Sequence, residues 1–335
     1  MNDSNQTPIM SLRNLSRRFA RRLDWAGKIG KKLGMNIRDE IVHAVDRVNL
    51  DIAPGEVVGL VGESGCGKST LGRMVCGILP PSEGDILYRG KNVAGLPPDE
   101  AKKMMLNVQM IFQDPFASLN PRKRVRDIIG EAPLVHKIVT RSELDDYVAE
   151  VMLLSGLDPE YGRRYPHQFS GGQRQRIGIA RALAVKPDFI VCDEAVAALD
   201  VSIQAQVLNL FMDLRKKLNL TYLFISHDLG VVEHISDRIV IMYLGRVVEI
   251  APAEPLFDAP LHPYTKALLE EVPRLEKRKT SYSPIKGEIP SPLDPPPGCH
   301  FHPRCPHAME ECRQQAPPLQ EVHPGRFCAC HLHTT

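Results

Sequence analysis

The chain has 335 residues, of which 43% are hydrophobic, and its formal net charge is only +2. This composition suits a globular protein of one large domain or two modest ones, and so small a charge gives no general field that would attract nucleic acid. No apolar run approaches the roughly 18 residues that a membrane-spanning helix needs, and the first residues do not resemble a signal peptide. We therefore expect a chain that is neither secreted nor membrane-spanning by its own signals.

A basic segment is the first distinctive feature along the chain. Residues Arg13 to Arg38 contain many lysines and arginines around Trp25, and Asp24 is the only acidic residue among them. Such a segment could contact anionic lipid headgroups or form a solvated insertion. Of the two, we favour the solvated insertion.

A phosphate-binding loop follows. Residues Val57 to Val61 form an apolar run that predicts a buried strand, and residues from Lys68 to about Gly77 predict a helix. The loop between them has the pattern G-x-x-x-x-G-K-[ST], for which this strand–loop–helix setting is the required context. Its glycines let backbone N–H groups converge on phosphate oxygens, and the helix N-terminus adds a positive dipole end. We assign to ATP binding the residues Gly62, Glu63, Ser64, Gly65, Cys66, Gly67, Lys68, Ser69 and Thr70.

Two residues of this loop carry distinct chemistry. Lys68 is expected to reach the β- and γ-phosphates of ATP, and Ser69 offers its hydroxyl to Mg²⁺. The alternative, a chance glycine turn, has little support, because the lysine, the serine and the flanking strand are all in place.

Further apolar runs alternate with helical segments. The runs that predict strands are Val108 to Phe112, Phe189 to Cys192, Tyr222 to Ile225 and Ile239 to Met242. Residues from Pro121 to Phe169 have a mainly helical and more polar pattern, and Gln173 to Val185 has the apolar spacing of a helix. Alternating strands and helices predict an α/β fold with a covered, mostly parallel sheet.

Two adjacent acids end the strand at Phe189 to Cys192. A buried strand of a parallel sheet delivers Asp193 to the carboxyl edge of the sheet, where ligands bind, and there it would hold Mg²⁺ together with Ser69. Glu194 can act as the general base that polarises the attacking water. Taken alone, two adjacent acids could simply be a solvated strand end. In a chain that also has a phosphate loop upstream, they indicate a site for ATP hydrolysis.

The most specific motif is Phe169-Ser170-Gly171-Gly172-Gln173. It closely resembles the LSGGQ signature of ATP-binding cassette (ABC) proteins, and the sequences RQR and IGIARAL that follow it are also usual in that family. A Ser-Gly-Gly turn that merely caps a helix is the alternative, and capping is expected in either case. In the family, this helix N-terminus faces the γ-phosphate of ATP held by the opposite subunit. The resemblance therefore implies that Ser170 and Gly172 donate to ATP across a dimer, with Gly171 and Gln173 in the same site.

The resemblance also implies a domain plan. Residues 1–278 would form an ABC nucleotide-binding domain of the P-loop NTPase class, with a mostly parallel core sheet, an antiparallel β subdomain and an inserted helical subdomain at about 121–169. Residues 279–335 would form a proline-rich linker and a small cysteine-rich C-terminal region.

Other family positions match one by one. Gln113 resembles the Q-loop glutamine that touches Mg²⁺ and water, His227 resembles the switch histidine near the γ-phosphate, and Asp200 resembles the D-loop aspartate. The implied catalytic residues are Glu194, His227 and Gln113. Phe19 is either the aromatic residue that stacks on adenine or a core aromatic, and neither alternative is favoured.

The chain departs from the family pattern at a few positions. Phe169 replaces a leucine, and Ala195 and Ala197 stand where proline and a hydroxyl residue are common. These changes affect no residue that handles phosphate, metal or water directly, so we expect a site competent for hydrolysis.

A narrower resemblance suggests the transporter type. The segments Phe112 to Phe116, Asn120 to Arg122, Asp200 to Gln206 and His262 to Thr265 are similar to the importers of dipeptides, oligopeptides and nickel. The sequence SGGQRQRIGIARAL looks most like the F-type ATPase subunit of the dipeptide importers. This implies a related D-type ATPase, two integral membrane permeases and an extracytoplasmic peptide-binding protein as partners, at the cytoplasmic face of the inner membrane. The alternatives are nickel, glutathione or another small cargo, or a soluble ABC ATPase without a transporter.

The last part of the chain is rich in proline and then in cysteine. The prolines fall between Ser281 and Pro297, and the cysteines that resemble a family set are Cys299, Cys305, Cys312 and Cys330. Members of this family can hold a [4Fe–4S] cluster on four such thiolates, whereas zinc or unligated thiols are the alternatives, in that order. Cys328 would be a spare thiol. We expect a structural role for this region, far from the phosphate chemistry.

Overall fold

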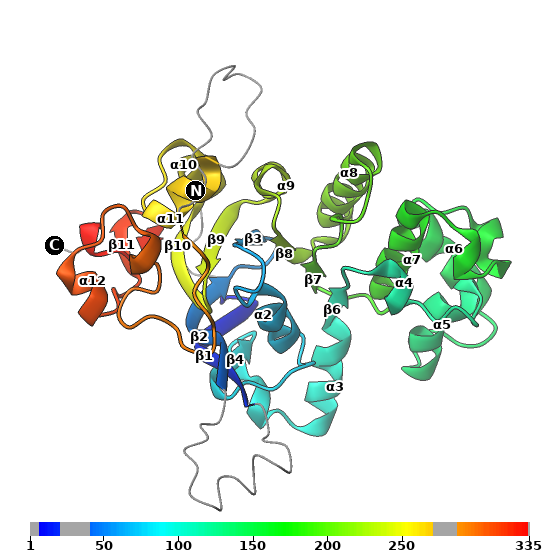
Figure 1. Ribbon diagram of the computed structural model, residues 1–335. Helices are drawn as coiled ribbons and strands as arrows, with labels where there is room; N and C mark the ends of the chain where they lie inside the picture. Colours follow the sequence, from blue (N-terminus) through cyan, green and yellow to red (C-terminus); the bar gives the residue numbers. More distant parts are fainter. Residues whose placement is uncertain (1–6, 21–40, 271–286, 334–335) are drawn as a thin grey trace, which may run out of the picture.

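Two β-sheets form the frame of the molecule (Figure 1). The computed structural model describes residues 7–20, 41–270 and 287–333, so most of the basic segment and the expected boundary near residue 278 lie outside the described residues. The larger sheet has eight strands in the order β11-β12-β10-β9-β3-β8-β7-β6, and the smaller has four in the order β2-β1-β4-β5. The strands are β1 Met10–Ala20, β2 Ile41–Ile52, β3 Val57–Val61, β4 Glu83–Tyr88, β5 Lys91–Asn92, β6 Val108–Ile111, β7 Phe189–Asp193, β8 Thr221–Ser226, β9 Arg238–Tyr243, β10 Arg246–Pro252, β11 Gln320–His323 and β12 Arg326–Cys328.

The centre of the larger sheet is parallel. Strands β6, β7, β8, β3 and β9 pair in parallel, whereas β10, β12 and β11 add antiparallel strands at one edge. Strands β3, β7 and β8 are buried along their whole length, as their continuous apolar sequences require. The predicted α/β fold with a mostly parallel core sheet is therefore confirmed.

Helices cover both faces of this sheet. Their bounds are α2 Lys68–Val75, α3 Pro98–Asn107, α4 Pro115–Ser118, α5 Val125–Val135, α6 Leu144–Leu154, α7 Gly171–Leu183, α8 Val201–Leu218, α9 Leu229–Ile235, α10 Ala253–Asp258, α11 Pro263–Glu270 and α12 Glu310–Gln314, with short 3₁₀ helices at Val93–Gly95, Pro159–Arg163, Pro166–Gln168, His302–Arg304 and His331–His333. Within the described ranges, no helix combines the length and the apolar character that crossing a bilayer would demand.

Successive side chains of β8 point to opposite faces of the larger sheet, so they belong to two different core clusters. Tyr222 and Phe224 point to the face covered by α7 and α8, where the Phe211 ring lies 5.6 Å and 5.9 Å from theirs, in edge-to-face geometry. Leu223 and Ile225 point to the opposite face, covered by α2, α3 and the smaller sheet. Side chains from both helical layers thus fix the position of β8 and of the residues that follow it.

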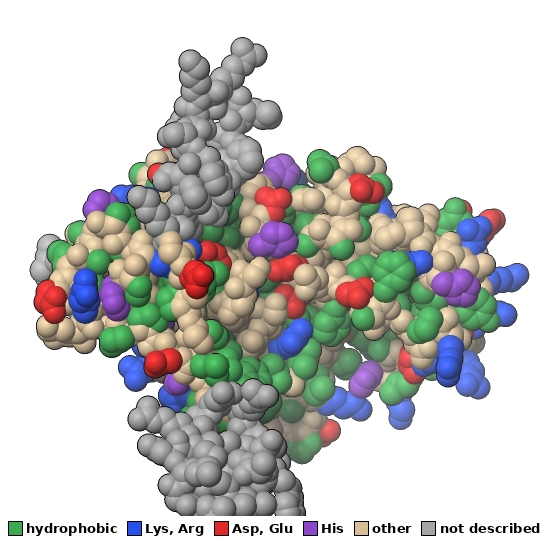
Figure 2. Space-filling model, in the orientation of Figure 1, with side chains coloured by type: hydrophobic (Ala, Val, Ile, Leu, Met, Phe, Trp, Pro, Cys, Tyr) green, Lys and Arg blue, Asp and Glu red, His purple; other side chains and the backbone are tan. Residues whose placement is uncertain are grey.

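The antiparallel β subdomain and the helical subdomain expected from the family resemblance are both present. In the smaller sheet, Met10 of β1 pairs with Ile52 of β2 and Tyr88 of β4, in antiparallel register. Helices α5 and α6 and two 3₁₀ turns form the helical subdomain, which Figure 1 shows beside α7 at one side of the molecule. Lys and Arg side chains gather over its outer edge in Figure 2, and the exposed arginines there are Arg122, Arg124, Arg141, Arg163 and Arg164.

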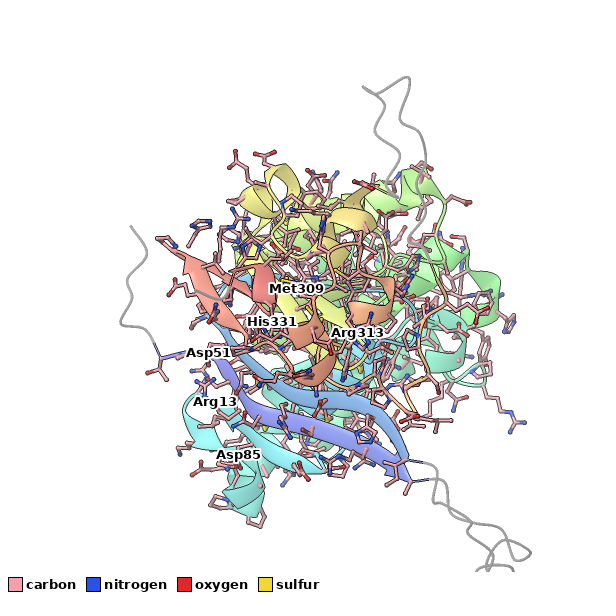
Figure 3. The ribbon with its side chains drawn as sticks, turned by 60° about the vertical axis from the view of Figure 1, so that its left-hand side comes forward. Arg13, Asp51, Asp85, Met309, Arg313 and His331 are labelled. Carbon is pink, nitrogen blue, oxygen red and sulfur yellow. The ribbon has the colours of Figure 1, made fainter. Side chains whose placement is uncertain are left out.

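The cysteine-rich region is part of the larger sheet. Strand β12 pairs with β10 through Glu249–Cys328 and Ile250–Phe327, and β11 then pairs with β12. Phe301 is only 1% exposed and belongs to a core cluster formed with α10, α11 and β9. Figure 3 shows this region, marked by Met309 and His331, beside the strands that carry Arg13 and Asp51. The C-terminal region therefore shares a core with the rest of the chain.

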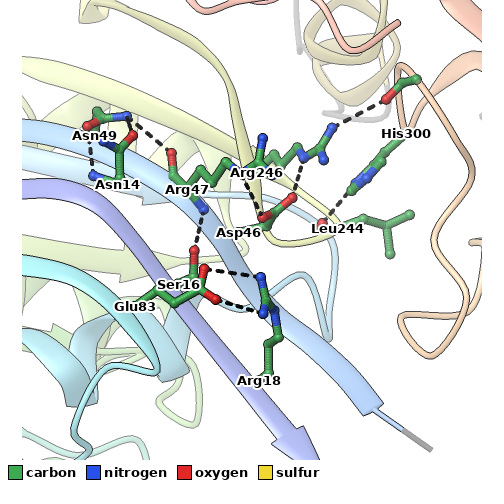
Figure 4. A network of polar contacts seen from close by, with 11 residues as sticks. Asn14, Ser16, Arg18, Asp46, Arg47, Asn49, Glu83, Leu244, Arg246 and His300 are labelled. Atoms are coloured by element: carbon green, nitrogen blue, oxygen red, sulfur yellow. Dashed lines mark hydrogen bonds and ion pairs between the residues drawn. The ribbon is translucent and has the colours of Figure 1, made fainter. Parts of the chain in front are cut away.

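A polar network also ties this region to β2 (Figure 4). The Arg246 guanidinium donates to the Asp46 carboxylate at 2.6 Å and to the carbonyl oxygen of Gly298 at 3.3 Å, and the His300 ring contacts the carbonyl oxygen of Leu244 at 3.1 Å. Burial raises the pKa of Asp46, but the hydrogen bond and charge of Arg246 outweigh it and hold that pKa below its usual value. Burial lowers the pKa of His300 to about 4, so the imidazole is neutral at physiological pH.

The packing of α8 predicts a stability effect. Phe211→Ala should lower the free energy of unfolding by about 3–5 kcal/mol, because the ring is fully buried against Tyr222 and Phe224. Leu218→Ala at the 43%-exposed end of the same helix is the control and should cost less than about 1 kcal/mol. Chemical denaturation measures both, and similar losses would contradict the packing described.

Candidate functional site

The loop Gly62–Ser69 connects the carboxyl end of β3 to the N-terminus of α2. Gly67 has φ of 106°, and a Cβ atom there would lie 2.0 Å from the carbonyl oxygen of Ala44, so only glycine fits this position. The Lys68 side chain is folded back over the loop, where its Nζ donates to the carbonyl oxygens of Gly62 at 2.6 Å and Glu63 at 3.0 Å. This geometry places an ammonium group and a helix N-terminus at one anion-binding position.

Ser69 and Asp193 meet beside the loop. The Ser69 hydroxyl donates to Asp193 Oδ1 at 2.7 Å, and Asp193 is 2% exposed at the end of β7. Burial raises the pKa of the Asp193 carboxyl, although the Ser69 hydrogen bond opposes this effect. A hydroxyl and a carboxylate side by side are suitable oxygen ligands for Mg²⁺.

The three residues expected to be catalytic come together around one carboxylate. Glu194 Oε2 accepts a hydrogen bond from Gln113 Nε2 at 2.7 Å and lies 3.4 Å from His227 Nδ1. Glu194 has φ of 48°, a left-handed conformation that costs a non-glycine residue about 1–3 kcal/mol and occurs at functional sites. The carboxylate is oriented by an amide on one side and an imidazole on the other, an arrangement that can hold and polarise a water molecule.

A cavity of about 340 Å³ lies next to these groups. Gln113 and Asp193 line it from two strand ends, and Arg73 of α2 adds a positive charge. Sequence patterns did not indicate Arg73, because it follows the loop motif by one helical turn and belongs to no signature.

The structure argues against one of the two alternatives for Phe19. Its side chain is 36% exposed, and the Arg17 guanidinium lies 4.7 Å from the centre of its ring. The core alternative is therefore wrong. Stacking of this ring on adenine stays a prediction.

The signature residues begin α7 and cap it. The N–H of Gln173 donates to Ser170 Oγ at 3.4 Å, and the N–H of Ser170 donates to Gln173 Oε1 at 3.1 Å, which together form a capping box. A Cβ atom on Gly172 would lie 2.4 Å from Ile203 Cγ2, so this glycine permits close packing of α7 on α8, the helix that follows Asp200. Figure 1 shows α7 with the helical subdomain, well separated from α2. The structure therefore does not bring the signature to this chain's own phosphate loop.

The C-terminal region reaches the phosphate loop, which corrects the expectation that it lies far from the phosphate chemistry. The Glu63 carboxylate accepts two hydrogen bonds from Arg304, at 2.8 Å and 3.0 Å. The N–H of Glu63 donates to Tyr264 Oη at 3.0 Å. Glu63 thus contacts α11 and the cysteine-rich region. No local motif marks Arg304, because its partner is distant in the sequence.

Four cysteines of the C-terminal region line one small cavity: Cys299, Cys305, Cys312 and Cys330. Cys328 is fully buried on β12 and is not among the residues that line this cavity. Burial raises the pKa of Cys299 to about 11 and also raises those of Cys305 and Cys330. Across residues 7–20, 41–270 and 287–333, no group of three or more histidine, cysteine or acidic side chains is placed to hold a metal ion.

A glycine-rich phosphate loop, a carboxylate pair at the next strand ends and a Ser-Gly-Gly-Gln helix cap, all on one covered parallel sheet, define the ATPase cassette of the ABC class. Two family models match the chain. The ABC transporter family matches residues 45–197, and the oligopeptide/dipeptide transporter C-terminal region matches residues 248–312.

Curated relatives agree over the whole length. The chain is 50% identical to the oligopeptide transport ATP-binding protein AppF of Bacillus subtilis (strain 168), in an alignment that covers 100% of both chains. It is 54% identical to the putative oligopeptide transport ATP-binding protein YkfD of the same organism, over 87% of this chain and 90% of the relative. The chain belongs to the ABC transporter family of ATP-binding proteins and is an ATPase of that family.

Solved structures give the same fold. The cassette cbiO1 from Clostridium perfringens matches with a TM-score of 0.62 and 25% identity, over 76% of this chain and 92% of that one. A dimeric post-hydrolysis state of the ATP-binding cassette MJ0796, bound to ADP and Pi, matches with a TM-score of 0.61 and 27% identity, over 73% of this chain and 98% of that one.

The phosphate loop yields a binding prediction. Lys68→Ala should weaken ATP binding at least about tenfold, because the ammonium group held over the loop is lost. Lys91→Ala is the matched control, since Lys91 is exposed and pairs with Glu100 away from the loop. Calorimetric titration of the full chain with ATP measures both variants, and unchanged affinity in Lys68→Ala would contradict the assignment.

Proposed function

We propose that this chain powers the import of dipeptides or oligopeptides by binding and hydrolysing ATP on the cytoplasmic side of a membrane transporter. The observation that carries the cargo class is the full-length similarity to an oligopeptide transport ATP-binding protein. The match of residues 248–312 to the C-terminal region of oligopeptide/dipeptide transporters supports the same class.

Hydrolysis follows from the groups at the strand ends. Lys68 and the loop N–H groups bind the β- and γ-phosphates, while Ser69, Asp193 and Gln113 would hold Mg²⁺, and a bound ion there would supply positive charge near the phosphates. Glu194 takes a proton from the attacking water as Gln113 and His227 orient its carboxylate.

Two cassettes are needed for one complete site. Ser170 and Gly172 lie at the N-terminus of α7, on the helical subdomain, so they serve the ATP of a second cassette. The dimeric cassette among the similar solved structures supports this arrangement. We infer a related D-type ATPase as the second cassette. Two integral permeases are the membrane partners, and an extracytoplasmic peptide-binding protein delivers the cargo to them.

The test of this function uses the assembled transporter in liposomes. Glu194→Gln should keep ATP binding and trap an ATP-bound dimer, but reduce ATP turnover and peptide uptake by at least about a hundredfold, because an amide cannot act as the base. Glu254→Gln, on the exposed surface of α10, is the control and should retain both activities. Turnover like that of the wild type in Glu194→Gln would refute the role of this carboxylate. Uptake of nickel or glutathione in place of peptides would refute the cargo.

A soluble ABC ATPase is the alternative function. It would remain in the soluble fraction after cell lysis, whereas a transporter subunit should co-purify with membranes through its permeases. Release of the chain from membranes that still contain the permeases would favour the alternative.

We also propose that the cysteine-lined cavity holds a [4Fe–4S] cluster. Cys299, Cys305, Cys312 and Cys330 come from separate segments and line one cavity, and four thiolates are the ligand set of such a cluster. The four irons of a cluster are spread over a cube, so its thiolates need not converge on one point as the ligands of a single zinc ion must. The family resemblance of the four cysteines ranks the cluster ahead of zinc.

Iron analysis tests the cluster. Anaerobically purified chain should be brown and contain iron and acid-labile sulfide in near-equal amounts, and Cys305→Ser should lose both. Cys328→Ser is the control and should keep them, because Cys328 does not line the cavity. Zinc without sulfide, or no metal at all, would overturn the proposal.

A further inference from the structure

Glu63 joins the C-terminal region to the phosphate loop. Its carboxylate is 17% exposed and pairs with the 4%-exposed Arg304 side chain through two parallel hydrogen bonds. Paired hydrogen bonds between arginine and a carboxylate fix direction as well as charge. Because Glu63 is the second residue of the loop, its position influences where the loop N–H groups point.

The backbone of Glu63 is also held by a residue outside the phosphate loop. Its N–H donates to Tyr264 Oη, and Tyr264 is fully buried with its ring 4.6 Å from that of Tyr243. Tyr243 Oη in turn accepts from Arg304 at 3.3 Å. The Glu63 side chain and N–H are therefore both fixed by a buried unit formed by β9, α11 and the C-terminal region.

Glu63 also contacts the loop lysine. Its carbonyl oxygen accepts from Lys68 Nζ at 3.0 Å and from the N–H of Cys66 at 3.2 Å. A continuous chain of polar contacts therefore runs from Arg304 through Glu63 to Lys68. A shift of Glu63 would displace the ammonium group that serves the phosphates.

Charge adds a second effect. An unpaired carboxylate in a loop that binds phosphates would repel them, most strongly where the surroundings are partly buried. Arg304 neutralises the Glu63 carboxylate. Removal of the guanidinium would therefore leave a negative charge beside the bound nucleotide and free the loop at the same time.

We propose that Arg304 is a positioning residue for the phosphate loop, through which the cysteine-rich region sets the nucleotide affinity of the ATP site. Arg304 stands next to Cys305 and ends the 3₁₀ turn His302–Arg304, with its N–H donating to the carbonyl oxygen of Phe301 at 3.0 Å. Phe301 is part of the buried core, so the turn is anchored and presents Arg304 to the loop.

A second pair at the other end of β3 supplies a matched control. Arg238 donates to the Glu56 carboxylate at 2.7 Å and 3.0 Å, with side chains 24% and 15% exposed. Glu56 directly precedes β3, whereas Glu63 follows it, so the pairs share chemistry and strand but only one touches the phosphate loop.

The experiment measures the Kd of the full chain for ADP with Mg²⁺ by calorimetry, so that hydrolysis does not interfere. Arg304→Gln should weaken ADP binding about tenfold, whereas Arg238→Gln should change it less than about twofold although both lower the melting temperature. Adding Glu63→Gln to Arg304→Gln should restore only the part of the affinity that repulsion by the unpaired carboxylate removes, so the double variant should still bind ADP more weakly than the wild type because its loop is no longer positioned.

Three results would overturn the role of Arg304: ADP affinity in Arg304→Gln within twofold of the wild type, equal weakening in Arg238→Gln, or full wild-type affinity in the double variant. If Arg304→Gln does not fold, Arg304→Lys replaces it. A lysine ammonium group cannot form the two parallel hydrogen bonds of the guanidinium, so this variant should bind ADP about two- to fivefold more weakly, and wild-type affinity would overturn the role.

The role of Arg304 rests on the proposed nucleotide site but not on the cluster. A wild-type chain that fails to bind ADP would refute the nucleotide site itself. Loss of iron without loss of ADP binding would be consistent with the proposed role of Arg304, because its contact with Glu63 involves no cysteine.

Discussion

The parallel register of four neighbouring strands is the constraint on which the rest of the site depends. Val61 of β3 lies opposite Ser226 of β8, and Asp193 of β7 lies opposite Ile225 of the same strand. Ile111 of β6 lies opposite Cys192 of β7. All four strands therefore end at one edge, and the residues after each end meet there.

A shift of one residue would destroy this arrangement. Because side chains alternate along a strand, such a shift in β7 would exchange the buried faces and move Asp193 away from Ser69. The two core clusters on either side of β8 oppose the shift, because alternate side chains of the strands pack into one cluster or the other. The apolar packing of the sheet thus sets the distances at which phosphate and water are handled.

Much of this site could be predicted because its information is local. The loop Gly62–Ser69 lies between a strand and a helix in the sequence, and Asp193, Glu194 and His227 directly follow apolar runs. The order of parallel strands then brings these residues together without any further signal. The same logic left the role of Phe19 open, since exposure of an aromatic residue depends on what the distant parts of the chain leave uncovered.

The C-terminal region shows what local patterns could not reveal. Its prolines and cysteines suggested a separate appendage, yet β12 extends the central sheet and Arg304 contacts a loop 241 residues earlier. The pairing of Arg304 with Glu63 depends on the core that Phe301 shares with β9 and α11. No local motif or hydrophobic periodicity predicts such a contact, because its two residues lie close together only in the tertiary structure.

The two halves of the catalytic apparatus are connected through α4. Gln113 touches the Glu194 carboxylate, and the next residue, Asp114, caps α4 by accepting from the N–H of Phe116 at 2.7 Å. The Phe116 ring lies 3.5 Å from the Arg174 guanidinium carbon of α7, close enough for a strong cation–π contact.

The other end of α4 is fixed to the same helix. Arg181 of α7 donates to the carbonyl oxygen of Ser118, so α4 contacts α7 at two points. A displacement of Gln113 at the hydrolysis site would therefore move α4 and α7 together as one unit. The N-terminus of α7 carries Ser170, so α4 joins the Gln113–Glu194 contact to the helix whose N-terminus we propose to serve the ATP of a second cassette.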